Sequence, residues 1–155
     1  MTTAQPPSVD PEVEELSEEE CRRLLGYTAV GRIAFVVDGR AVLFPVNYRS
    51  ASSDTGVWIL LRTRPGNTID GAPEHVTFEI DGIDESHQQG WSVLVRGILH
   101  HLDHNEIELS RHRFDPKPWP HQERTSWLAI KPQTITGRRL HPAEPEWALP
   151  SEAYL

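Results

Sequence analysis

The chain has 155 residues, of which 37% are hydrophobic and 25% are charged, so it is long enough for one globular domain with a substantial core. Its formal net charge of -8 argues against non-specific binding to nucleic acid or to an anionic membrane, because both need a cationic surface. A single cysteine, Cys21, excludes an intrachain disulfide framework and a cysteine-based zinc site.

The two ends of the chain differ in composition from its middle. Residues 1–15 are rich in Pro, Thr and acidic side chains, which predicts a flexible acidic N-terminal tail. Residues 143–155 are again rich in Pro and Glu and form a C-terminal extension. The folded domain is therefore expected over residues 16–142. No apolar run approaches the ~20 residues that span a bilayer and no secretory signal is evident, so we expect a cytoplasmic protein without a membrane partner.

The domain opens with a helix and a hairpin. Ser17-Glu18-Glu19-Glu20 has the form of a capping box and predicts a short helix ending near Gly26, with Cys21 on its apolar face. Two β-rich runs, Val30–Val37 and Ala41–Tyr48, are joined by Asp38-Gly39, the strongest short-range signal for a hairpin.

Pro45 lies inside the second of these runs. Because proline cannot donate a hydrogen bond to a strand ladder, it predicts a bulge or an edge where a ligand or a subunit meets the backbone. A loop is expected over Ser50–Gly56, and the apolar run Val57–Leu61 predicts the next strand.

The stretch Arg62–Asp70 carries the first candidate site. Pro65-Gly66 predicts a turn, followed by a short helix capped by Asn67 or Thr68. A helix start offers unpaired N–H donors and the positive end of its dipole, so phosphate binds there, and Arg62 and Arg64 would add bidentate donors. An ordinary strand-turn-helix joint with two solvated arginines would have the same sequence.

The second half of the domain is again dominated by strands. Alternation of Val76, Phe78 and Ile80 predicts a strand, followed by a long surface loop over Asp81–Gly90. Gly97 interrupts a long strand and would allow the bend that closes a small barrel. The remaining predicted elements are a strand over Trp91–Leu102, a helix over Asn105–Arg113, and two final strands over Ser126–Lys131 and Gln133–Leu140, separated by Pro132.

These elements predict a mainly β (α+β) fold, an antiparallel barrel of about six or seven strands with a few short helices. Several strands are apolar on both faces, which a barrel standing alone does not need. A homodimer that covers the outer face is the simplest explanation.

Three histidines, His100, His101 and His104, lie close together in the sequence. Adjacent strand residues point to opposite faces, so His100 and His101 cannot both bind one metal from a regular strand. Only His101 and His104 could converge, and no pattern of further ligands completes a zinc site. We therefore predict solvated or interface histidines and no metal site.

In order and spacing, several stretches resemble the pyridoxamine 5'-phosphate oxidase-like family, whose members are FMN-binding split β-barrels, and especially its short actinobacterial-type members. The resemblance covers roughly residues 17–140. The stretches are Val30–Phe35, Phe44–Tyr48, Arg62-Thr63 with Gly66, Phe78–Asp81, Gly90–Gly97 and Ile135–Arg139.

The resemblance implies a homodimer that holds two FMN molecules in clefts between its subunits. The residues that would lie along the isoalloxazine and ribityl chain, largely through backbone groups, are Pro45, Val46 and Asn47. The residues that would hold the phosphate are Arg62, Thr63, Asn67 and Thr68. Trp91 and Ser92 would face the flavin from a neighbouring strand or from the other subunit.

The phosphate segment departs from the family pattern. Relatives commonly place Ser-Lys or Ser-Arg-Lys after the turn glycine, where this chain has Asn67-Thr68-Ile69. A lost cation removes a charge-assisted contact worth roughly 1.5 to 3 kcal/mol, for which Arg64 would have to compensate. FAD, a deazaflavin coenzyme and haem are therefore alternative ligands to FMN.

The function that the resemblance implies is that of a flavin-dependent oxidoreductase acting on an unknown small substrate, with reduced nicotinamide or a deazaflavin as electron donor. No general acid or base is assigned, because the flavin carries the redox step in such enzymes. The alternative is a binding protein of the same fold that sequesters flavin, deazaflavin or another phosphorylated nucleotide without turnover. Vitamin B6 oxidation is not expected, because genuine pyridoxamine phosphate oxidases are longer.

Overall fold

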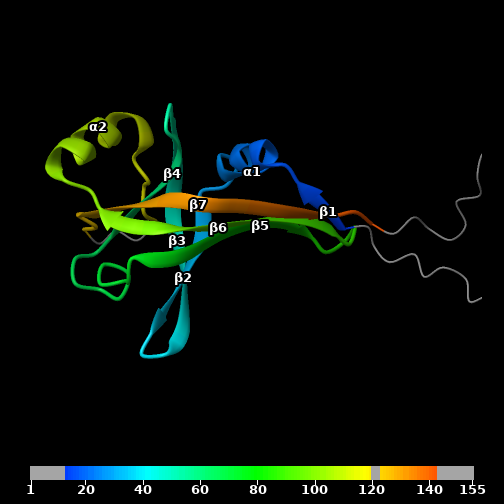
Figure 1. Ribbon diagram of the computed structural model, residues 1–155, viewed down its shortest axis with the longest axis horizontal. Helices are drawn as coiled ribbons and strands as arrows, with labels where there is room; N and C mark the ends of the chain where they lie inside the picture. The colour runs from blue at the N-terminus through cyan, green and yellow to red at the C-terminus, as the bar shows by residue number, and fades with distance from the viewer. Residues whose placement is uncertain (1–12, 120–122, 143–155) are drawn as a thin grey trace, which may run out of the picture.

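The computed structural model describes residues 13–119 and 123–142 (Figure 1). Seven strands and two helices make up this part of the chain. In chain order they are β1 (Val13–Leu16), α1 (Glu18–Leu25), β2 (Val30–Val37), β3 (Arg40–Ser53), β4 (Gly56–Thr63), β5 (His75–Asp84), β6 (Gln89–His101), α2 (His104–Phe114) and β7 (Ser126–Leu140). Neither helix is long and apolar enough to cross a bilayer.

The strands form one closed antiparallel sheet. Its order is β1-β7-β4-β3-β2-β5-β6, and β6 also pairs with β7, so that six strands close into a barrel with β1 attached along the far end of β7. The predicted mainly β fold with an antiparallel barrel is therefore confirmed. In Figure 1 the β2–β3 hairpin projects from one side of the barrel, and both helices lie on the other side.

Alternation along the strands fills the barrel with apolar side chains. Completely buried members of this core include Ile33, Ile59, Phe78, Val93 and Leu128. Helix α1 adds Cys21 and Leu25, both 0% exposed, to the same cluster. Burial raises the pKa of the Cys21 thiol, as is usual for a cysteine on the apolar face of a helix.

The first helix and the first hairpin were predicted correctly from short-range sequence signals. Ser17 caps α1, and Ser17 and Glu20 form the predicted capping box. Asp38 and Gly39 have φ values of 50° and 74°, the left-handed pair that a tight hairpin between β2 and β3 requires.

Two predicted loops are instead largely strand. β3 runs to Ser53 and pairs with β4 as far as Gly56, so only two residues remain of the loop expected over Ser50–Gly56. Likewise β5 extends to Asp84 and β6 begins at Gln89. Apart from Ile83, both extensions consist of small or polar residues whose pairing is set by the partner strand rather than by their own alternation.

The two predicted final strands are one continuous strand, β7. Pro132 does not end it, because the register between β6 and β7 shifts at Arg96/Gly97, and Pro132 stands opposite Gly97 at that irregularity. A Cβ on Gly97 would lie 2.5 Å from the Lys131 carbonyl oxygen, so the strands approach too closely there for any side chain. The expected bend of β6 at Gly97 is thus accompanied by a bend of the partner strand β7 at Pro132.

The folded chain also begins earlier than predicted. Val13–Leu16 forms β1, which pairs with the last residues of β7 from Gly137 to Leu140, so the predicted tail of residues 1–15 is too long by three residues. This strand was missed because its residues are mostly exposed and acidic, and only pairing with β7 makes it a strand. Residues 1–12 and the predicted extension 143–155 lie outside the described part of the chain.

Candidate functional site

Strands β3 and β4 separate where most of the predicted site residues lie. They pair from Ser53 opposite Gly56 to Tyr48 opposite Leu61, and no further. Beyond that point β3 stays with β2, whereas β4 continues along β7. We call this place the β3/β4 fork; it is flanked by Pro45–Asn47 on one side and by Arg62–Thr63 on the other.

Pro45 lies on the open edge of β3 at the fork. The Tyr48 amide donates to the Ala29 carbonyl oxygen on the β2 side, at 3.0 Å. Because backbone groups alternate in direction along a strand, the backbone of Asn47 and the missing N–H of Pro45 face away from β2, towards the fork. The prediction of an edge at Pro45 is therefore confirmed.

The segment after β4 turns but does not form the predicted helix. The Asn67 amide donates to the Arg64 carbonyl oxygen at 3.3 Å, and the Asn67 side chain accepts from the Asp70 amide at 2.9 Å, so Asn67 does cap the turn. Only a few residues separate Gly66, whose φ is 77°, from Gly71, which is too short a distance for a regular helix.

A carboxylate of the chain itself, that of Asp70, binds inside this turn. It accepts hydrogen bonds from the Gly66 amide at 2.8 Å, from His101 Nε2 at 3.0 Å and from the Ser126 hydroxyl. The Gly66 amide, followed by Ser126 and His101, lowers the pKa of Asp70 to about 2. Asp70 therefore ties the turn to the end of β6 and the start of β7, and uses one amide that was expected to face a phosphate.

Other donors of the turn remain available for an anion. Within the described part of the chain, no acceptor is found for the amides of Arg64, Thr68 and Ile69. The side chains of Arg64 and Thr68 are exposed beside them. The turn thus still fits an anionic group, through amides different from that of Gly66.

Arg62 and Thr63 point to opposite faces of β4. Thr63 is 1% exposed, and its hydroxyl accepts from Asn67 Nδ2 at 2.6 Å on the core side. The Arg62 guanidinium lies on the outer face, 5.0 Å from the centroid of the Trp127 ring. The two side chains therefore do not converge, although the resemblance gave both of them to one phosphate.

Residues that follow α2 contact both sides of the fork. Arg62 Nη1 donates to the Asp115 carboxylate at 2.9 Å, and Arg62 Nε donates to the Arg124 carbonyl oxygen at 3.0 Å. The Trp119 amide donates to Asn47 Oδ1 at 3.0 Å. Arg124 Nε is buried, and none of the described residues accepts a hydrogen bond from it. A buried guanidinium donor in this state suits an anionic partner.

Trp91 and Ser92 lie across the sheet from the fork in the same chain. Ser92 pairs with Asp81 of β5, whose carboxylate binds Arg32 of β2 at 3.1 Å, and Arg32 pairs with Pro45. Three strand spacings of about 4.8 Å each therefore separate Ser92 from the open edge of β3. One chain thus brings Pro45–Asn47 and Arg62–Thr68 together at the fork, whereas Trp91 and Ser92 lie on another strand of the barrel.

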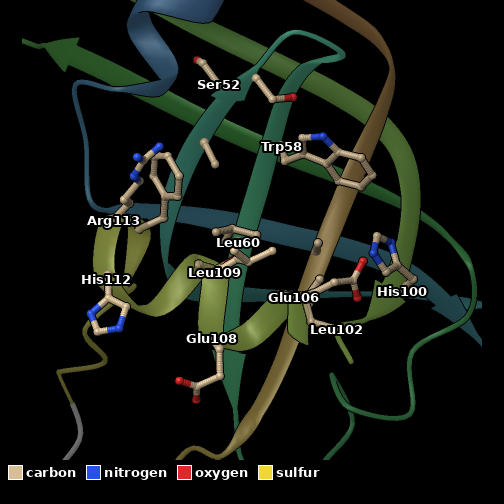
Figure 2. A pocket seen from close by; sticks show the side chains of 15 residues that line it. Ser52, Trp58, Leu60, His100, Leu102, Glu106, Glu108, Leu109, His112 and Arg113 are labelled. Carbon is tan, nitrogen blue, oxygen red and sulfur yellow. The ribbon is translucent and has the colours of Figure 1, made fainter. Parts of the chain in front are cut away.

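A second site, which the sequence did not reveal, lies between α2 and the outer face of the sheet (Figure 2). This α2 cavity has a volume of about 600 Å³. Its sheet side includes Trp58 and Leu60, on the same face of β4 as Arg62, and no residue of α2 is buried against them. The related sequence signal was that several strands are apolar on both faces, which we interpreted as a dimer contact. On β4, α2 partly covers that outer face.

The histidines do not form a metal site in the described part of the chain, where no three potential ligands converge. His100 lies edge-on to Trp58 with 5.4 Å between ring centroids, whereas His101 binds Asp70. These two neighbours use opposite faces of β6, as expected from strand geometry.

Comparison with known proteins agrees with this architecture. The family model for pyridoxamine 5'-phosphate oxidase matches residues 17–139. An uncharacterized protein of Mycobacterium tuberculosis is 28% identical over 136 residues, which cover 83% of this chain and 86% of that protein.

Two solved structures share the fold over most of their length. An FAD-binding protein from Mycobacterium smegmatis superposes with a TM-score of 0.71 at 34% identity, covering 83% of this chain and 98% of the other. An FAD-binding protein from Mesorhizobium loti gives a TM-score of 0.65 at 25% identity, covering 84% and 98%.

Proposed function

The chain belongs to the pyridoxamine 5'-phosphate oxidase family, and from this we propose that it binds a flavin nucleotide at the β3/β4 fork and acts as a flavin-dependent oxidoreductase on a small substrate. The single observation that carries the proposal is the fork itself. It brings an open backbone edge at Pro45–Asn47 next to a donor-rich turn at residues 64–69. The FAD-binding proteins with the same fold support a flavin as the ligand.

The phosphate of the FMN moiety would be held by the turn and by the outer face of β4. The amides of Arg64, Thr68 and Ile69 and the Thr68 hydroxyl provide neutral donors. Arg62 adds a guanidinium whose Nε and Nη1 bind Arg124 and Asp115, and none of the described residues accepts a hydrogen bond from its Nη2. Asn67 and Thr63 act indirectly, because their mutual hydrogen bond fixes the turn against β4.

The ring system would lie along the open edge of β3, where Pro45, Val46 and Asn47 offer backbone groups. A bound flavin supplies the redox chemistry, and the protein supplies orientation and exclusion of water. Trp91 and Ser92 would complete the site from the second subunit of a homodimer.

The first experiment tests binding and turnover. The visible spectrum of the purified protein should show bound flavin once FMN or FAD is added, and a reduced nicotinamide or a reduced deazaflavin should bleach that flavin in repeated cycles with an acceptor. A tightly bound flavin that neither donor reduces would instead support the sequestration alternative. A protein whose spectrum and fluorescence show no flavin binding would remove the proposal.

The second experiment tests the assignment of Arg62. Arg62→Ala should weaken FMN binding about 10- to 100-fold and riboflavin binding by less than about threefold, because only FMN carries the phosphate. Asp115→Ala is the matched control, since it breaks the same ion pair and leaves the guanidinium in place. Equal losses for FMN and riboflavin in Arg62→Ala would contradict the assignment.

A further inference from the structure

The α2 cavity lies directly beside the proposed phosphate site. Trp58, Leu60 and Arg62 alternate along the outer face of β4, so each is about 7 Å from the next. Phe114 lines the cavity, and the following residue, Asp115, forms the ion pair with Arg62. The cavity therefore ends at Phe114, next in sequence to the residue that pairs with the guanidinium we assign to the flavin phosphate.

The two ends of the cavity carry different polar groups. Arg113 lies at one end, and Trp58, His100 and Glu106 lie at the opposite end (Figure 2). Outside the first end lies Arg62, whose guanidinium is paired with the Asp115 carboxylate at 2.9 Å. This arrangement suits a ligand with an anionic group next to the arginines and a neutral, nitrogen-rich ring next to the carboxylate.

The far end of the cavity has the chemistry of a base-binding site. The Trp58 ring is held by His100 at 5.4 Å and by the Lys131 ammonium at 5.7 Å, so an aromatic surface is fixed in position. One oxygen of Glu106 accepts from the Asp103 amide within the helix cap, which leaves the other to accept from an exocyclic amino group. Leu60, Leu109 and Phe114 supply apolar contacts between the two ends.

The cavity also has the size and the support of a built site. Its volume of about 600 Å³ falls within the usual range for small-molecule pockets. Helix α2 is held at both ends, by the Asp103–Glu106 capping box and by the Asp115–Arg62 ion pair, while none of its residues is buried. The helix therefore spans the cavity instead of filling it.

From these observations we infer that the α2 cavity is an adenosine subsite, so that the flavin bound by this chain is FAD, with its FMN half at the β3/β4 fork and its adenine on Trp58. The inference rests on the proposed function. In this arrangement the outer face of β4 binds part of the ligand.

The test is a set of equilibrium titrations of the purified full-length chain with riboflavin, FMN and FAD, followed by flavin fluorescence and by calorimetry. The wild-type protein should bind FAD at least about tenfold more tightly than FMN, because base stacking on an aromatic ring contributes that much or more. Trp58→Ala should lose this difference and keep its FMN affinity within about twofold. Trp58→Phe should retain most of it, because a stacking ring remains.

Two further variants distinguish an effect on ligand binding in the cavity from a general effect on folding. Leu109 is 77% exposed, so Leu109→Trp should fold normally, fill the cavity and weaken FAD at least about tenfold without changing FMN binding. His100→Ala is compared with His87→Ala, a change in the exposed β5–β6 turn, and only the former should affect FAD.

The outcomes distinguish the two proposals. If FMN binds but FAD binds no more tightly, or if Trp58→Ala and Leu109→Trp weaken FMN and FAD equally, the adenosine subsite is wrong and the flavin site at the fork stands. If the wild-type protein binds none of the three flavins, both proposals fail.

Discussion

At the scale of single residues, Asp70 connects the turn beside the fork to two strands. It gathers donors from the turn, from β6 and from β7, three segments that are distant in sequence. The pKa of Asp70 is held at about 2, below its usual value of 3.8, so the folded protein prefers the charged form. Its contribution to stability is complete above about pH 4 and is lost as the pH falls towards 2.

We predict that Asp70→Asn lowers the free energy of unfolding at pH 7 by about 1 to 3 kcal/mol, because it removes a charged acceptor of three hydrogen bonds. Thermal melts at pH 7 and pH 3 should show a smaller pH dependence for the variant than for the wild type. Asp54→Asn, in the exposed β3–β4 turn, is the control and should leave both melts unchanged. A variant that melts like the wild type at pH 7 would show that the turn does not depend on this carboxylate.

What could be predicted about the site depended on how local the interactions are. Asn67 capping the turn was readable, because its partner lies three residues away. The contacts of Asp70 with His101 and Ser126 were not, since 31 and 56 residues separate these pairs. The pairing of Arg62 with Asp115 was hidden for the same reason and changes how many donors Arg62 can offer a ligand.

At the scale of elements, the paired irregularity in β6 and β7 shapes the barrel. Both strands are long, and both bend where Gly97 meets Pro132. Pro132 has no N–H to donate, and Gly97 has no side chain to collide with the Lys131 carbonyl group. The sequence showed each of these residues separately, and it suggested a break in β7 because nothing local indicated that they face each other.

We predict that Gly97→Ala destabilises the fold by about 1 to 3 kcal/mol, because the new methyl group would have to displace backbone atoms. Gly71→Ala is the matched control. Its Cβ would meet its nearest atom at 3.8 Å, so we expect a change within about 0.5 kcal/mol. Urea denaturation of the three proteins measures both effects, and equal midpoints for the two variants would argue against a close contact at Gly97.

The helix and the first hairpin show what the sequence does determine. A capping box and an Asp-Gly pair act over four residues or fewer, and both elements were predicted correctly. The ends of β3, β5 and β1 depend on a partner strand, and these were the boundaries that differed. Closure of the barrel could be predicted from the number of strands. The cavity beneath α2 could not, because it depends on where this weakly amphipathic helix packs.

At the scale of the whole molecule, the β2–β3 hairpin presents an apolar surface. Val36 and Leu43 are 61% and 60% exposed at the part of the barrel that projects in Figure 1. Exposed apolar side chains grouped on one hairpin are typical of a contact surface. The homodimer remains a prediction, and this hairpin is where we expect part of its interface.

Light scattering should therefore give a particle of twice the chain mass of 17.6 kDa. Leu43→Asp should shift the particle towards the monomer at micromolar concentration, because it places a charge in the apolar contact. Leu109→Asp, at a position on α2 that is even more exposed, is the control and should leave the mass unchanged. A wild-type monomer would also remove Trp91 and Ser92 from the flavin site.

Pro45 has one more consequence, which concerns the chain before it meets a partner. A freshly synthesised protomer presents the first half of β3 as a bare edge, and such edges recruit strands from other molecules into growing fibres. Proline interrupts the row of donors at the centre of that edge, so an incoming strand cannot complete its ladder. Pro45, which leaves room at the fork, thus also makes this edge a poor template for strand addition and so disfavours aggregation of the unassembled protein.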